Sequence, residues 1–338
     1  MPDPRLLLIP QLYRIFLTPI TAIGIIGNTF NIIVLTRRGL YNNPCSRYFI
    51  ALASNNLFFS TFFVTFNLLS TGYSLDPTGY SRILCKLILF VQQTSMVVSP
   101  YFIVLAAIDR FLASSISARR RNLSNLTVAR WAISFILIFF SLFFISSLVL
   151  LEPQPGQMVP CRISAVTLYG RIYPIMQIVF LSVIPPILMV IFGLLTIYNT
   201  KQVNTVTTGD SRFRRTQYEL IRMLLAQVIC FLIVCTPLGA IYIIGFLAIT
   251  ILSPIDYYFW FRMAQMLYMF SYATSVFLYF LSASLYRKQL VYIIKKLLRL
   301  NTGAIYGSTN GHSVQPWTIK PTKRSRIVPF TIEQTKKV

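Results

Sequence analysis

Residues 87–108 read LILFVQQTSMVVSPYFIVLAAI, a run without Asp, Glu, Lys or Arg. A helix needs about 20 mostly apolar residues to cross the hydrocarbon core of a bilayer, since its backbone hydrogen bonds then stay within the segment. This run is therefore long enough to span a membrane. Six other charge-free runs share this character: 15–36, 48–75, 131–151, 172–200, 223–255 and 263–286. The chain is predicted to be an all-α membrane protein, with a seven-transmembrane helix bundle over residues 15–286.

The composition also indicates a membrane protein. Hydrophobic residues make up 55% of the 338 residues and charged residues only 12%, and the mean hydropathy is +0.66. A soluble protein with so few charged side chains would lack the polar groups that usually cover a protein surface. The seven runs also leave little room in the sequence for a soluble domain.

The net charge of +23 has two explanations. A strongly basic protein can bind nucleic acid phosphates, but membrane proteins also keep basic loops on the cytoplasmic side. If the N-terminus is outside, the inner loops and the tail hold 24 of the 31 Lys and Arg residues. The others are Arg5, Arg14, Arg82, Lys86, Arg162, Arg171 and Arg262. We therefore expect a multi-pass plasma membrane protein with an extracellular N-terminus, a cytoplasmic C-terminus, contacts with membrane lipids and no nucleic acid partner.

Three segments lie outside this predicted bundle or at its edge. Residues 1–14 are expected to form a short extracellular segment without a cleavable signal peptide, because Arg14 closely follows a short apolar stretch. Residues 284–299 place Leu and Ile against Lys and Arg, which predicts a short amphipathic helix in the membrane interface. Residues 300–338 are rich in Gly, Ser, Thr and basic residues and are expected to form a disordered cytoplasmic tail.

Two of the five cysteines lie on the predicted outer side, Cys85 and Cys161. Extracellular cysteines in oxidising surroundings tend to pair. A disulfide between them would pin the loop that contains Cys161 over the outer end of the bundle. The alternative is a pair of free thiols.

The run 87–108 is followed by Asp109-Arg110-Phe111, and Arg110 lies 25 residues after Cys85. On a helix this separation is about 37 Å, so the two residues mark opposite membrane faces. The chain here resembles the rhodopsin-like (class A) family of G-protein-coupled receptors. In that family the third helix runs from a disulfide cysteine to an Asp/Glu-Arg-Tyr signature with this spacing. Phe111 stands in place of the Tyr.

The resemblance covers residues 15–299, and most of the runs supply a partial match. The matching positions are Gly27-Asn28, Leu52-Ala53 with Asn56-Leu57, Pro185 and Pro186, Phe231 and Pro237, Ser275 to Tyr279, and Tyr286-Arg287. The resemblance implies a receptor that converts binding of an extracellular ligand into activation of a heterotrimeric G protein. It also implies that a receptor kinase and arrestin act on the tail.

The resemblance assigns roles to three groups of residues. They are a G-protein coupling switch of Asp109, Arg110, Phe111 and Tyr279, a polar packing core of Asn28, Asn56, Ser99 and Ser275, and a pivot of Phe231, Cys235 and Pro237. A charged residue near the end of a spanning helix needs a partner or water and is a functional candidate by default. The alternative is that Arg110 only anchors its helix by reaching the headgroup region.

Some family positions carry other residues in this chain. Gln217 stands where the family has a carboxylate that can pair with the arginine, and Glu219 lies about 200° further around a helix. We therefore expect elevated basal signalling. Asn56 replaces the Asp with which such receptors commonly hold sodium, so sodium binding is expected to be weak. Cys235 stands where a Trp is frequent.

The ligand is expected between the outer halves of the runs. The candidate residues are Gln92, Met96, Gln177, Tyr242, Arg262, Gln265 and Tyr268. Gln92 replaces the Asp of amine receptors, and Met269 replaces the Lys with which opsins hold retinal. Arg262 can meet a ligand carboxylate or carbonyl, or it can pair with Asp256. We expect a short neuropeptide, since the pattern resembles invertebrate neuropeptide receptors of the FMRFamide-like type.

Two other classes of protein remain open, a polytopic transporter or channel and a receptor for a non-peptide chemosensory ligand. A transporter usually shows internal repeats or ionisable residues deep in its helices, and neither is evident in the sequence. An enzyme is not expected, because His312 is the only histidine and the sequence shows no cluster suited to a metal or to nucleophilic chemistry. No cofactor is predicted.

Overall fold

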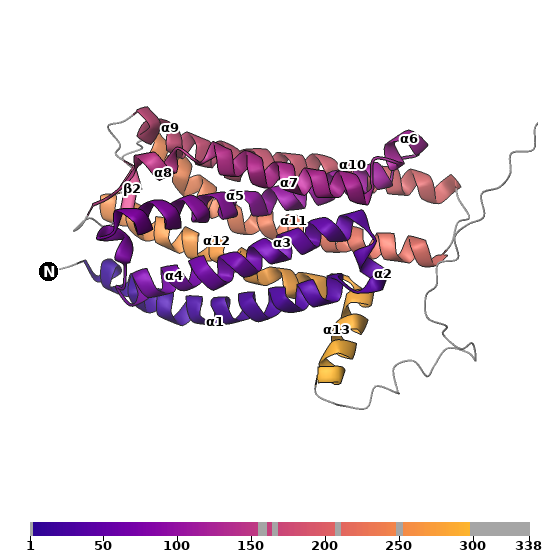
Figure 1. The fold of residues 1–338 in the computed structure, drawn as a ribbon, viewed down its shortest axis with the longest axis horizontal. Helices are drawn as coiled ribbons and strands as arrows, with labels where there is room; N and C mark the ends of the chain where they lie inside the picture. Colours follow the sequence, from indigo (N-terminus) through magenta and orange to yellow (C-terminus); the bar gives the residue numbers. More distant parts are fainter. Residues whose placement is uncertain (1–2, 155–160, 164–167, 207–210, 248–252, 298–338) are drawn as a thin grey trace, which may run out of the picture. The chain divides into compact units, whose positions relative to one another are not determined.

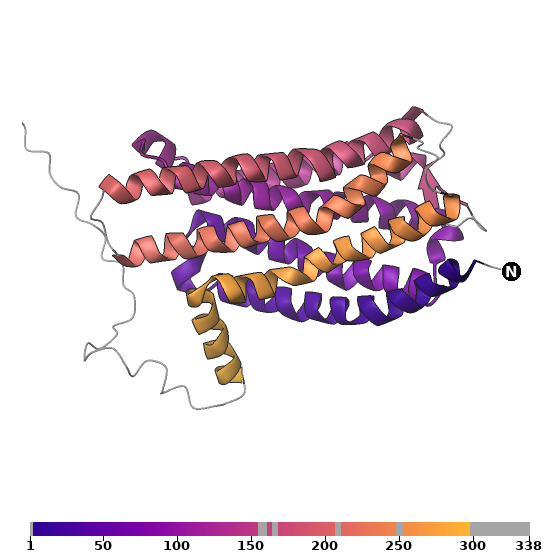
Figure 2. The same cartoon turned by 180° about the vertical axis from the view of Figure 1, so that it is seen from behind.

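The computed structural model describes residues 3–154, 161–163, 168–206, 211–247 and 253–297. Within these residues, seven helices are long and apolar enough to cross a membrane. They lie side by side in Figures 1 and 2, joined by short segments. The predicted seven-transmembrane helix bundle is thus confirmed.

The seven spans consist of the following elements. The first three are α1 (Pro4–Leu35), the series α3 (Pro44–Phe59), η1 (Ser60–Val64), α4 (Thr65–Asn67) and η2 (Leu68–Gly72), and α5 (Arg82–Ala113). The fourth is α7 (Leu126–Phe143) with α8 (Ser147–Leu150), and the fifth is α9 (Leu168–Gln177), η4 (Ile178–Val183) and α10 (Ile184–Val206). The last two are α11 (Ser211–Phe246) and α12 (Pro254–Ser282). Short elements between and after them are α2 (Arg38–Tyr41), the 3-10 turn η3 (Pro77–Gly79), α6 (Ala118–Arg121), the strands β1 (Leu151–Pro153) and β2 (Cys161–Ile163), and α13 (Ser284–Leu297).

The first helix begins much earlier than its charge-free run. Asp3 caps α1 by accepting a hydrogen bond from the backbone N–H of Arg5 at 2.9 Å, and Pro4 occupies the first turn, where a missing N–H costs nothing. Ile9 and Tyr13 on this extension are buried. Residues 4–14, which we predicted as a separate segment, are therefore the first turns of α1.

The second and fifth spans contain π-helical turns, η1 and η2 in the second and η4 in the fifth. Directly after η4 come Pro185 and Pro186, which have no N–H to donate and whose rings crowd the carbonyl four residues earlier. A widened turn before the prolines relieves this crowding. The apolar runs predicted these spans but not the change in helical pitch within them.

The helix α5 lies at the centre of the bundle. Its most apolar window is 72% buried, against 22% for the span Leu126–Leu150. It packs against α3, α7, α10 and α11. Side chains on α5 are therefore placed to contact several of the other helices at both ends of the bundle.

The helix α1 approaches its neighbours closely at two glycines. A Cβ atom on Gly27 would lie 2.6 Å from Cγ1 of Val276, and one on Gly24 would clash with Ser60. Only glycine permits this separation, which brings α1 against α12 and η1. Small residues at such contacts are typical of helices that pack in membranes.

The helix α13 matches the amphipathic helix predicted over 284–299. Tyr286, Leu290 and Ile293 are buried, whereas Lys288 and Val291 are exposed. Arg37, beyond the end of α1, lies over the ring of Tyr292, with its Cζ 5.8 Å from the ring centroid. The predicted tail, 300–338, lies outside the described residues.

Candidate functional site

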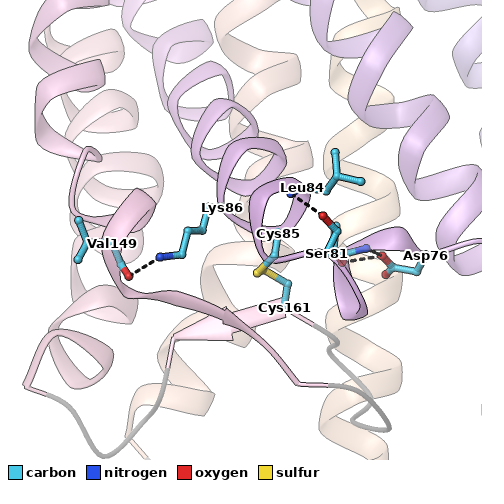
Figure 3. The surroundings of a disulfide bond; sticks show 8 residues. Asp76, Ser81, Leu84, Cys85, Lys86, Val149 and Cys161 are labelled. Atoms are coloured by element: carbon cyan, nitrogen blue, oxygen red, sulfur yellow. Dashed lines mark hydrogen bonds between the residues drawn. A yellow bond between two sulfur atoms is a disulfide. The ribbon is translucent and has the colours of Figure 1, made fainter.

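At one end of the bundle, a disulfide joins Cys85 in the first turn of α5 to Cys161 on β2, with 5.6 Å between the Cα atoms (Figure 3). Ser81 caps α5, and the ammonium of Lys86 donates to the carbonyl of Val149 at 2.9 Å. The predicted pair is confirmed, and two free thiols are excluded. We call this the disulfide end of the bundle.

Two further contacts hold the β-hairpin at the disulfide end. The strands β1 and β2 are antiparallel, with Pro153 opposite Cys161. Arg82 at the start of α5 forms an ion pair of 2.8 Å with Glu152 on β1. The hairpin is therefore fixed to α5 by a covalent bond and by one ion pair, and Lys86 holds α8 just before β1.

At the opposite end of α5, Arg110 is only 2% exposed and forms an ion pair of 2.5 Å with Asp109. Its Nη2 also donates to Oδ1 of Asn43, at 3.1 Å, in the segment before α3. The other carboxylate oxygen of Asp109 accepts a hydrogen bond from Ser124 at 2.7 Å. A side chain that only anchored the helix would reach toward water, whereas Arg110 is turned into the protein.

Phe111 and Tyr279 have other neighbours. The ring of Phe111 lies against Phe192 of α10, with 5.7 Å between centroids. Tyr279 is fully buried between Phe49 and Tyr286, with 5.4 and 5.8 Å between ring centroids, and its hydroxyl has no hydrogen-bond partner among the described residues. The predicted switch is therefore spread over several helices, and one buried hydroxyl in it is unsatisfied.

The four residues of the predicted polar core form two separate pairs. In the first, the hydroxyl of Ser275 donates to Oδ1 of Asn28 at 3.0 Å, which joins α12 to α1. Asn31 donates to the same hydroxyl at 2.9 Å and accepts from Tyr286 at 2.5 Å. The sequence reasoning did not select Asn31 or Tyr286 for this cluster, although Asn31 lies on the face of Asn28 at i+3.

The second pair joins α3 to α5. The hydroxyl of Ser99 donates to Oδ1 of Asn56 at 2.9 Å and accepts from Nδ2 of Asn55 at 2.7 Å. Asn55 also accepts from Ser95 at 2.9 Å. Both Asn55 and Ser95 were missed, because an amide beside a more familiar motif position gives no signal of its own in a single sequence.

The candidate ligand residues come from four helices, and some of them meet. The hydroxyl of Tyr268 on α12 donates to the carbonyl of Met96 on α5 at 3.0 Å. Gln177 on α9 donates to Gln93 at 2.7 Å, whereas the neighbouring Gln92 was the residue predicted. Both Gln92 and Gln177 are buried. These contacts join α12 and α9 to α5.

The remaining ligand candidates lie nearer the disulfide end. The ring of Tyr242 on α11 contacts Phe261 of α12 at 5.8 Å. Arg262 donates from Nη1 to Gln265 at 3.3 Å and from Nε to the hydroxyl of Tyr258 at 3.0 Å. Its alternative partner, Asp256, instead forms an ion pair with Arg5, so that alternative is wrong.

The family of the chain follows from its sequence match as well as from this geometry. The family model described as "7 transmembrane receptor (rhodopsin family)" matches residues 27–283. The chain belongs to the rhodopsin family of seven-transmembrane receptors. Members of this family are receptors and not enzymes, which agrees with the expectation for this chain.

Three relatives of this receptor are themselves receptors. Somatostatin receptor type 5 of Rattus norvegicus is 25% identical over 326 residues, which cover 95% of this chain and 85% of that receptor. Galanin receptor 2b of Danio rerio is 30% identical over 102 residues, covering 30% of this chain and 26% of that receptor. Neuropeptides B/W receptor type 2 of Bos taurus is 29% identical over 130 residues, covering 38% of this chain and 37% of that receptor.

The predicted pivot of the receptor lies within α11, which continues through Pro237. Phe231 and Cys235 are buried one turn apart, on the same face of the helix. The thiol of Cys230 lies 3.7 Å from the hydroxyl of Thr274 on α12. The proline removes one backbone hydrogen bond and gives α11 a position at which it can bend.

The polar core leads to a prediction about sodium. Asn56 and Ser99 offer neutral oxygens, and Ser275 is bonded to Asn28 and Asn31 in the other cluster. We expect ligand affinity to be the same in sodium chloride and in N-methylglucamine chloride. Asn56→Asp would restore a carboxylate, the kind of hard ligand that such cations prefer, and should make affinity depend on sodium. A several-fold sodium effect in the unmodified receptor would contradict this prediction.

The N-terminal part of α11 is tied to the start of α13. Ser284 donates its hydroxyl to the carboxylate of Glu219, which is buried. This contact joins α11 to the segment that follows α12. The side chain of Gln217, the family position of the carboxylate, lies outside the described residues.

Ser284→Ala is expected to raise basal nucleotide exchange at least about threefold, because it removes a hydrogen bond to the Glu219 carboxylate and so weakens the attachment of α11 to α13. Ser282→Ala is the matched control, since the Ser282 hydroxyl donates to the carbonyl of Leu278 in its own helix and, among the described residues, joins no other helix. The measurement is GTPγS binding to membranes without ligand. Equal basal exchange in the two variants would show that the contact does not restrain α11.

Proposed function

We propose that this receptor binds a short peptide at its disulfide end and activates a heterotrimeric G protein at the end that carries Arg110. The observation that carries the proposal is the buried Asp109–Arg110 pair at the inner end of the central helix, held by Asn43 and Ser124. A charge buried in this way is costly unless every contact is made. A movement of the surrounding helices therefore changes whether Arg110 is sequestered or accessible to a partner.

The relatives support a peptide ligand. The relative that aligns with 95% of this chain is a receptor for somatostatin, and the others are receptors for galanin and for neuropeptides B and W. The chemistry of the disulfide end agrees with a peptide, since amide and hydroxyl side chains such as Gln92, Gln265 and Tyr268 can bond a peptide backbone. Resemblance to the invertebrate FMRFamide-like type remains a narrower prediction, since all three relatives are vertebrate receptors.

The proposed direction of signalling implies a membrane topology for the receptor. The N-terminus and the disulfide are extracellular, where thiols are oxidised, and the inner loops and the C-terminus are cytoplasmic. The basic inner loops contact anionic lipids, and the serines and threonines after residue 300 are substrates for a receptor kinase that recruits arrestin.

Two other functions are less well supported. A transporter or channel would carry ionisable residues along its pathway, whereas Asp109 and Arg110 lie at one end of the described bundle and Arg262 lies toward the other. A receptor for a non-peptide chemosensory ligand would use the same coupling end. Only the chemistry of the ligand that it binds would distinguish it from a peptide receptor.

The test is a screen of short synthetic peptides on membranes from cells that express the receptor, with membranes from cells that carry the empty vector as control. We expect at least one peptide to increase GTPγS binding only when the receptor is present. Peptide-driven ion flux without any increase in GTPγS binding would favour the channel instead.

A further inference from the structure

Arg262 is a cation surrounded by neutral groups. Its Nε donates to the hydroxyl of Tyr258 at 3.0 Å, and its Nη1 donates to Oε1 of Gln265 at 3.3 Å. Its own backbone carbonyl accepts from the hydroxyl of Tyr13 on α1 at 3.1 Å. The guanidinium also lies over the ring of Tyr258, with Cζ 5.1 Å from the centroid. These contacts orient the side chain, but none of them supplies a negative charge.

Every carboxylate at the disulfide end has other partners. These carboxylates belong to Asp3, Asp76, Glu152 and Asp256, and all four residues are described. Asp256 forms an ion pair with Arg5, which also reaches Asp3, and Glu152 forms its ion pair with Arg82. Asp76 bonds the backbone N–H and the hydroxyl of Thr78.

The undescribed segments that adjoin these helices in sequence add no further carboxylate. Residues 1–2, 155–160, 164–167 and 248–252 contain no Asp or Glu. By sequence, seven Lys and Arg residues and only four Asp and Glu residues belong to this end. The end therefore has an excess of positive charge, which attracts anionic ligands and raises their rate of association.

A partly buried guanidinium has five N–H groups in a planar fork that matches a carboxylate. Two of the hydrogen bonds just described go to uncharged oxygens, on Tyr258 and Gln265. A charge in this position is expensive unless it meets an opposite charge. We propose that Arg262 binds a carboxylate of the ligand between α1 and α12, and that Tyr13, Tyr258 and Gln265 position it for that contact. The inference rests on the proposed function, because it names the chemistry of that ligand.

The carboxylate comes either from the C-terminus of the peptide or from an Asp or Glu side chain. A peptide that is amidated and lacks acidic residues would leave the charge of Arg262 uncompensated in the complex. Such a peptide is therefore expected to bind weakly. A receptor for amidated peptides without acidic residues, by contrast, would bind such peptides tightly.

The experiment uses the full-length receptor in nanodiscs of neutral lipid and one pool of short peptides, synthesised once with free C-termini and once as amides. Each pool contains members with and without Asp or Glu. Binding is read as the shift in the thermal unfolding temperature, and coupling is read separately as GTPγS binding. Arg262→Gln removes the charge, and Arg262→Lys keeps it without the planar fork.

We expect every peptide that stabilises the receptor to carry a carboxylate. Arg262→Gln should weaken the affinity for such a peptide at least about tenfold, which is the usual effect of losing a charge-assisted hydrogen bond. Neutralising that carboxylate should weaken binding to the unmodified receptor by a similar factor, but not to Arg262→Gln. Arg262→Lys should lie between the two. Loss of affinity on amidation alone assigns the C-terminus, and loss on Asp-to-Asn or Glu-to-Gln exchange in the peptide assigns a side chain.

Arg14→Gln is the matched control. Arg14, on α1, is another arginine near this end, but it bonds the carbonyl of Gly72 and lies over the ring of Tyr73. This variant should keep the preference for a carboxylate, and it also controls for a general loss of folding.

Amides without acidic residues that bind as tightly as free acids would overturn the inference and leave the proposed function standing. Equal weakening of the unmodified receptor and of Arg262→Gln by neutralisation would do the same. Acidic peptides that bind through Arg262 without raising GTPγS binding would support the inference and contradict the proposed function. If no member of either pool binds, both are contradicted.

Discussion

Arg110→Ala is expected to reduce ligand-driven nucleotide exchange at least about tenfold, while ligand affinity at the disulfide end changes little. The guanidinium is buried against Asp109 and Asn43, where it can be exposed only by movement of the surrounding helices. Loss of a contact of this kind to a partner is worth about 1.5–3 kcal/mol, and each 1.4 kcal/mol corresponds to a factor of ten. The measurement is GTPγS binding at saturating peptide, with affinity measured in parallel.

Arg119→Ala is the control for this substitution, since Arg119 is an exposed arginine on α6, a short helix close to the same end of α5. Removing Arg110 also leaves Asp109 buried without its ion pair, which costs about 3–5 kcal/mol in stability. The amount of folded receptor must therefore be matched between variants. Unchanged exchange by matched amounts of Arg110→Ala would remove Arg110 from the coupling switch.

Cys161→Ser is the second substitution for which we expect a large effect. The disulfide closes a loop between residues 76 apart in sequence. The loop-closure model gives about 4 kcal/mol for a loop of this size. The variant is expected to unfold at a lower temperature and to lose peptide binding, because the hairpin β1–β2 is no longer held over the start of α5.

Cys230→Ser is the control for the disulfide, since Cys230 is a free and partly buried cysteine on α11. Reduction of the unmodified receptor should reproduce the effect of Cys161→Ser and should have no further effect on that variant. An unfolding temperature and a peptide affinity that stay unchanged in Cys161→Ser would show that the bond is dispensable.

The path between the two ends of the receptor can be followed through hydrogen bonds along α12. Tyr272 donates to the hydroxyl of Tyr268 at 3.2 Å, and Tyr268 in turn donates to the carbonyl of Met96. The carbonyl of Tyr272 accepts from Asn28 at 2.8 Å, and Asn28 accepts from Ser275. Through Asn31 the series reaches Tyr286 on α13. A ligand that displaces Tyr268 would therefore disturb contacts that extend to Tyr286 on α13.

Much of the fold could be predicted because hydrocarbon imposes a simple rule on the sequence. Each charge-free run is long enough to cross the bilayer as a helix whose backbone hydrogen bonds stay within the run. Seven runs therefore predicted seven spans. The disulfide was predictable because Cys85 and Cys161 are the two cysteines on the predicted outer side. The early start of α1 was missed because Arg14 interrupts the apolar pattern, yet it bonds the carbonyl of Gly72 and remains within the helix.

The contacts within the site were less predictable. Asn28, Asn56, Ser99 and Ser275 were chosen one by one at family positions, and no sequence pattern shows that they form two clusters. Which amide meets which hydroxyl depends on helix rotation of a few tens of degrees, set by close approaches such as that of Gly27 to Val276. The pairing of Gln177 with Gln93 instead of Gln92 has the same cause, because adjacent positions on α5 point about 100° apart.

We propose that a ligand at the disulfide end activates a G protein at the Arg110 end, with no other protein required. The most direct measurement is the rate of nucleotide exchange by a purified heterotrimer with the purified receptor in nanodiscs and a peptide that binds it. We predict that the peptide accelerates exchange with the unmodified receptor and not with Arg110→Ala. A peptide that binds the receptor but leaves the exchange rate of every heterotrimer at its receptor-free value would contradict the account.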